Sequence, residues 1–140
     1  MAEAYVIVSH DIGDGESVLV LTRPGRDDFL AEMCSSGGDR SRYRLIVRTV
    51  ARIQRRGAPF RGTMVRSLDS GLSLVEVKVP GRVIRVMAYE GARLVLLFSF
   101  DGHQGSDKIS RSDMEKARRL AAEARKAASQ FEEGIVPWPS

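Results

Sequence analysis

This sequence is poor in cysteine, in long apolar runs and, over one stretch, in acidic residues. Its single cysteine, Cys34, excludes a disulfide within the chain and a zinc site built from several cysteines. No apolar run approaches the roughly 20 residues needed to cross a bilayer. The N-terminus, MAEAYVIVSHD, lacks the basic start of a secretory signal. We therefore expect a cytoplasmic protein, with one domain over residues 1–134 and a proline-broken tail over 135–140.

Acidic residues are absent from positions 40–66, which is also the most basic part of the chain. Nine arginines occur there: Arg40, Arg42, Arg44, Arg48, Arg52, Arg55, Arg56, Arg61 and Arg66. The net charge is +4 and would be −5 without these nine, so the basic character is local. Local positive charge usually meets an anionic partner. The excess of arginine over lysine suits bidentate phosphate contacts, although a GC-rich genome explains the ratio equally well.

The hydrophobic pattern predicts two strands, two helices, three strands and a last helix. Residues rich in β-branched side chains at 4–10 and 16–23 flank the glycine-bearing loop 11–15, which predicts a hairpin. A short helix is expected within 23–34. A longer one is expected over 40–56, where apolar residues recur at i, i+3, i+4 and i+7. Arginines at i+4 spacing follow a second face of this longer helix, so it is amphipathic with a continuous arginine edge.

Three strands are expected within residues 75–100, with tight turns near positions 80 and 90. Such turns place Glu76 opposite Arg85, and Lys78 opposite Val83, on one face of the sheet. Strands that follow one another and helices that cluster indicate the α+β class. We expect a mainly antiparallel twisted sheet with a helical pair and a C-terminal helix packed on it.

The C-terminal helix is expected to begin at Ser110 or Ser112, because each has an acidic residue three positions later. Helix-favouring composition lasts to about Glu133, and Gly134 ends it. Residues 58–71 are expected to form a loop with a possible short strand.

Four segments between Leu68 and Leu120 read LDSGLSLVEVKV, VIRVMAYEG, RLVLLFSFDGH and DMEKARRL, in this order. In sequence and spacing they resemble the RelE/HigB toxins of bacterial toxin–antitoxin systems, particularly the phage-associated HigB-like branch. The resemblance implies a compact RelE-like sheet with a cleft that cuts mRNA on the ribosome, without a metal or other cofactor. It also implies a partner antitoxin that neutralises the activity.

Carried over residue by residue, the resemblance assigns catalytic roles to Glu76, Lys78 and Arg85, with Arg85 helping to hold the scissile phosphate. This sequence departs from the family where a lysine pair is expected, since Gly102 and His103 stand there. His103 could replace a lysine as the proton-transfer group, because histidine titrates near neutral pH.

The arginine helix would add attraction to RNA phosphates that does not depend on base sequence. The candidate RNA-binding residues are Arg44, Arg48, Arg52, Arg55, Arg56, Arg61, Arg66 and Lys108. Three alternatives stay open. The same fold could bind RNA or a protein target without cleavage, as gyrase-inhibiting relatives do. A small α+β protein could dock an acidic partner through its arginines. Finally, Glu76 and Arg85 could form a plain cross-strand ion pair, and the arginines a solvated helix face.

Overall fold

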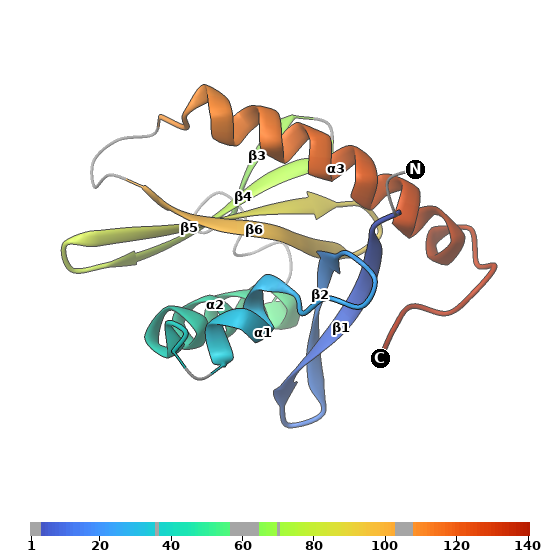
Figure 1. Ribbon diagram of the computed structural model, residues 1–140, viewed down its shortest axis with the longest axis horizontal. Helices are drawn as coiled ribbons and strands as arrows, with labels where there is room; N and C mark the ends of the chain where they lie inside the picture. Colours follow the sequence, from blue (N-terminus) through green and yellow to red (C-terminus); the bar gives the residue numbers. More distant parts are fainter. Residues whose placement is uncertain (1–3, 36, 57–64, 70, 103–107) are drawn as a thin grey trace.

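The computed structural model describes residues 4–35, 37–56, 65–69, 71–102 and 108–140. Six strands form one mixed sheet, with a helical pair on one face and a long C-terminal helix on the other (Figure 1). The predicted α+β class is confirmed at this level. Within the described ranges, no helix has the length and apolar character needed to cross a membrane.

The sheet contains both the N-terminal hairpin and the central strands. In chain order the strands are β1 (Val6–Gly13), β2 (Glu16–Thr22), β3 (Val65–Asp69), β4 (Leu72–Val79), β5 (Arg82–Glu90) and β6 (Leu94–Gly102). Across the sheet their order is β1-β2-β6-β5-β4-β3. The neighbouring strands are antiparallel except β2 and β6, which are parallel and pair Leu19 with Val95 and Val20 with Leu96. The hairpin therefore extends the central sheet.

The register of β4 and β5 is the one that the sequence predicts. Glu76 lies opposite Arg85, and Lys78 lies opposite Val83. The turn between the two strands contains Gly81 at a φ of +73°, a backbone conformation that residues with a Cβ rarely adopt. The short turn fixes the pairing, and the pairing then places alternate residues on opposite faces.

Helix α2 (Arg40–Arg56) spans its predicted range, and α3 (Arg111–Glu132) lies close to its own. The side-chain oxygen of Ser110 accepts a hydrogen bond of 3.0 Å from the backbone N–H of Asp113, which caps α3. The predicted start at Ser110 is confirmed, and the alternative start at Ser112 is wrong.

Helix α1 (Phe29–Cys34) is much shorter than the window 23–34 in which a helix is expected. The chain first turns at Gly25, which has a φ of +76°. The Asp28 carboxylate then accepts a hydrogen bond of 2.8 Å from the backbone N–H of Ala31. The helix begins only after this cap, because the preceding proline–glycine turn is not helical.

Each face of the sheet buries its own apolar cluster. The cluster under α2 contains Ile46 and Val50 of the helix, and the cluster under α3 contains Leu74 and Met87 of the strands. Helix α3 contributes small residues to its cluster: Ala117, Ala121, Ala124 and Ala128. Because side chains alternate along a strand, Arg85 shares the α3 face with Met87.

Candidate functional site

Arg85 is buried in the middle of the sheet, with an exposed fraction of 2%. Its Nε atom lies 3.3 Å from Oε2 of Glu76, and its Nη1 atom donates a hydrogen bond of 2.8 Å to the backbone carbonyl of Lys108. The cross-strand ion pair that the register predicts is therefore present. The expected role of Arg85 in holding a phosphate requires a side chain that is open to solvent. In the structure this side chain is buried instead.

Gly102 makes this burial possible. A Cβ atom added at Gly102 would lie 2.5 Å from Nε and 2.6 Å from Cζ of Arg85, closer than real Cβ contacts come. The resemblance expects a lysine at this position, but a side chain there would collide with the guanidinium. The missing lysine and the buried arginine are thus two aspects of one packing arrangement.

The environment of Arg85 is that of a structural ion pair. Taking a guanidinium out of water is costly unless it is paired and hydrogen-bonded, and both conditions hold here. Glu76, whose side chain is 16% exposed, provides the opposite charge at Nε, and the carbonyl of Lys108 accepts a hydrogen bond from Nη1. These contacts tie β4 and β5 to the chain just before α3.

The remaining predicted catalytic residues are not assembled around Arg85 in the described chain. Lys78 is exposed near the end of β4. His103 lies outside the described residues, as does Arg61 of the expected RNA-binding set. Of the expected catalytic residues that the structure describes, Arg85 and Glu76 form an ion pair, and Lys78 lies two residues after Glu76 on the same strand.

Helix α2 carries an exposed row of arginines, Arg44, Arg48 and Arg52, which we call the arginine ridge. Within the part of the chain that the structure describes, none of these three forms an ion pair. Figure 1 shows α2 and α3 on opposite faces of the sheet. The sheet therefore lies between the arginine ridge and the side chain of Arg85.

A hollow of about 490 Å³ lies between the arginine ridge and the turn of the β1–β2 hairpin. Arg55, at the end of the same helix face, donates two hydrogen bonds of 2.7 Å to the Glu16 carboxylate beside it. These hydrogen bonds hold the pKa of Glu16 below its usual value and raise the pKa of Arg55. Glu16 thus neutralises one cation at the wall of the hollow, which four arginines and the two carboxylates of Asp14 and Glu16 line.

A second hollow, of about 290 Å³, lies on the β4 side of the arginine ridge. Arg48 and Arg52 line it together with Lys78 and Glu76. Lys78, expected beside Arg85 as a catalytic residue, therefore borders the ridge. Two of the three ridge arginines line both hollows.

The other predicted RNA-binding residues are dispersed. Arg56 is the last residue of α2, whereas Arg66 is half-buried on β3. Arg66 lies opposite Leu74, so it belongs to the α3 face of the sheet. Lys108 is exposed just before α3, and its backbone is what contacts Arg85.

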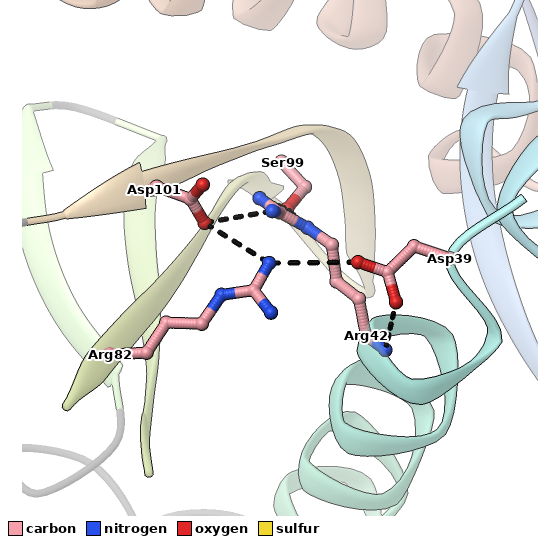
Figure 2. A network of polar contacts seen from close by, with 5 residues as sticks. All are labelled: Asp39, Arg42, Arg82, Ser99 and Asp101. Carbon is pink, nitrogen blue, oxygen red and sulfur yellow. Dashed lines mark hydrogen bonds and ion pairs between the residues drawn. The ribbon is translucent and has the colours of Figure 1, made fainter. Parts of the chain in front are cut away.

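Arg42, although it belongs to the arginine-rich segment, is a structural residue (Figure 2). It lies 2.7 Å from Asp101 and donates hydrogen bonds to the hydroxyl of Ser99 on β6. Arg82 lies 3.6 Å from both Asp101 and Asp39, so two arginines share two carboxylates. This network fixes the start of α2 against β5 and β6. Sequence reasoning missed it because its members are far apart in the chain.

A second cluster that the sequence did not predict joins the β1–β2 hairpin to α1 and α2. Nε2 of His10 lies 2.7 Å from the Tyr43 hydroxyl, and its Nδ1 lies 3.6 Å from Oδ2 of Asp28. Burial, followed by the nearby thiol of Cys34, raises the pKa of Tyr43. A raised pKa keeps the phenol protonated, so this cluster does not present an activated nucleophile. Its hydrogen bond joins β1 to α2.

Comparison with known protein families, with curated proteins and with solved structures finds no match to this chain. Within the described residues, no group of three or more histidine, cysteine or carboxylate side chains could hold a metal ion. The arginine ridge is the described feature with the clearest capacity to bind, because it combines exposed charge with adjoining hollows.

Proposed function

We propose that this protein binds RNA through the arginine ridge of α2, by contacts to phosphates that do not depend on base sequence. One observation carries the proposal: Arg44, Arg48 and Arg52 are exposed, lack ion pairs in the described chain and line a hollow of about 490 Å³. Successive ridge arginines are four residues apart, which is a rise of about 6 Å along a helix. A row of guanidinium groups at this spacing suits an extended anionic backbone.

A charge-reversal experiment tests this proposal. The variant Arg48→Glu with Arg52→Glu is expected to bind a fluorescent single-stranded RNA at least ~10-fold more weakly, because each lost phosphate contact lowers affinity. Fluorescence anisotropy measures the affinity. The matched control is Arg111→Glu with Lys126→Glu, two exposed residues of α3 whose reversal changes the net charge equally. Equal weakening of RNA binding in both variants would show that only the total charge matters and would contradict a binding site at the arginine ridge.

The wider proposal is that the protein is a toxin of the RelE/HigB type, held in check by a partner antitoxin. Two features support it. A helical pair precedes consecutive antiparallel strands, and Glu76 and Arg85, the positions to which the resemblance assigns roles, lie opposite one another. Induced expression is expected to arrest growth, and co-expression of a small neighbouring gene product is expected to restore it. Unimpeded growth on induction would contradict a toxin.

Cleavage of mRNA is a second candidate activity, with one specific observation in its favour. Gly102, which contacts the Arg85 guanidinium, is followed directly in sequence by His103. Primer extension on translated mRNA, in wild type and in His103→Ala, tests it. Loss of a proton-transfer group is expected to lower cleavage at least ~10-fold. RNA binding without any cut would leave the binding proposal intact and remove the nuclease.

A further inference from the structure

A crevice of about 250 Å³ opens between α3, the end of β2 and the middle of β6. The parallel strands β2 and β6 pair over only two positions, the second being Val20 opposite Leu96. No further pair between them follows in the described chain, and the next residues of each strand, including Thr22 and Phe98, line the crevice. The crevice therefore lies just beyond the point where the pairing of β2 and β6 ends.

The lining of this crevice carries an excess of positive charge. Arg23 and Arg26 come from the loop after β2, Lys116 and Arg119 come from α3, and Asp27 is the one carboxylate among the lining residues. Lys116 and Arg119 are three residues apart, so they lie on the same face of the helix. Within the described chain, Arg26, Lys116 and Arg119 form no ion pair. An anion would complement this group of cations.

Aromatic rings line the same crevice. They are Tyr5, Phe29 and Phe98, one from each of three separate segments. The Lys116 ammonium lies 4.4 Å from the ring centroid of Phe98, and the guanidinium carbon of Arg23 lies 5.4 Å from that of Tyr5. Cations and flat apolar surface thus stand side by side. A ligand that matches both has a planar ring system joined to a phosphate.

We infer that this crevice binds one nucleoside monophosphate unit, with its phosphate at Lys116 and Arg119 and its base among the aromatic rings. The volume lies just below the ~300–1,000 Å³ usual for small-molecule sites, which limits the occupant to a single nucleotide. The unit is either a free mononucleotide or the terminal nucleotide of an RNA. The crevice shares no residue with the hollows beside the arginine ridge, so the inference stands apart from the function proposed above.

Isothermal titration calorimetry of the full chain with AMP, adenosine and inorganic phosphate tests the inference. AMP is expected to bind at least ~10-fold more tightly than either part alone, because only AMP occupies both the cations and the rings. The variant Lys116→Glu with Arg119→Glu is expected to weaken AMP binding at least ~10-fold. The control Arg111→Glu with Lys126→Glu reverses two charges of the same helix outside the crevice and is expected to change AMP affinity less than ~2-fold.

Three results would overturn the inference. They are the absence of AMP binding at millimolar concentration, phosphate binding as tightly as AMP, and equal weakening in the two charge-reversed variants. Circular dichroism and thermal unfolding establish that both variants fold, which their exposed positions favour. A 5′-phosphorylated trinucleotide then distinguishes the sources. If it binds at least as tightly as AMP with the same dependence on Lys116 and Arg119, the site takes RNA ends, and if it binds more weakly, the site takes free nucleotides.

Discussion

The guanidinium of Arg85 occupies the space that a side chain at Gly102 would need. A buried arginine on β5 and a larger residue at the end of β6 therefore exclude one another in this fold. The lysine that the family resemblance expects at position 102 would force Arg85 out of its pairing with Glu76. This relationship explains why the expected phosphate-binding arginine is instead part of the core.

Substitution of Gly102 by alanine is expected to destabilise the protein by about 1–3 kcal/mol, because overpacking a filled site displaces its neighbours. Urea denaturation measures the change in the free energy of unfolding. The variant Arg85→Met removes the group that the new methyl would strike. The double variant is therefore expected to cost less than the sum of the two single changes, with a coupling of about 0.5–3 kcal/mol. Strict additivity would contradict the contact.

RNA binding is expected to weaken as salt rises. Three phosphate contacts from the arginine ridge, Arg44, Arg48 and Arg52, predict a slope of about −2 when the logarithm of the association constant is plotted against that of salt concentration. Arg48→Glu with Arg52→Glu is expected to bring the slope to about −0.7, which corresponds to one remaining contact. Anisotropy titrations across salt concentrations measure both values. A flat plot for the wild type would rule out an ionic interface.

Glu16→Gln is expected to tighten RNA binding by about twofold to fivefold. The change removes the carboxylate that holds Arg55 at 2.7 Å and so leaves one more guanidinium for phosphate, a modest gain because an exposed ion pair is weak. Asp69→Asn is the matched control, since it removes one negative charge from an exposed pair with Arg118 on β3 and α3. If the control tightens binding equally, net charge rather than Arg55 is responsible.

Tyr43 is expected to ionise above the usual tyrosine pKa of about 10, because burial disfavours the phenolate. In the unfolded chain this tyrosine loses its proton near pH 10, while the folded protein still retains it. The stabilisation from this group is therefore complete below about pH 10 and is lost as pH rises through the folded pKa. Tyrosinate absorbance measures the titration, and the difference between wild type and Tyr43→Phe isolates it. A difference curve centred at or below the ordinary value would disprove the shift.

Much of the fold follows from local patterns. Apolar periodicity predicts α2 over its full length, and the serine–acid spacing predicts the start of α3 at Ser110. The short turn after β4 predicts the pairing of Glu76 with Arg85. The pattern fails at α1, where the tendency of residues 23–34 to form a helix is overridden by the turn at Gly25 and the cap at Asp28. The parallel pairing of β2 with β6 has no local signal, because it joins strands far apart in sequence.

The candidate sites also divide into those with a local signal in the sequence and those formed by residues far apart in the chain. The arginine edge of α2 is visible in the sequence, because helical spacing alone aligns it. The Arg42 network and the contact between His10 and Tyr43 are not visible, since their partners lie 57–59 and 33 residues away. The nucleotide crevice combines residues from both ends of the chain, so no single motif marks it.

The sequence by itself determined most of the strands and helices, the register of the β4–β5 hairpin and where positive charge accumulates. These depend on interactions between residues close in the chain, through periods of 2 and 3.6 and through tight turns. Only the tertiary structure decided that Arg85 is enclosed and that the arginine ridge lies on the opposite face of the sheet. The accessibility of a side chain depends on what packs over it, and here the covering groups are Gly102 and a carbonyl 23 residues away.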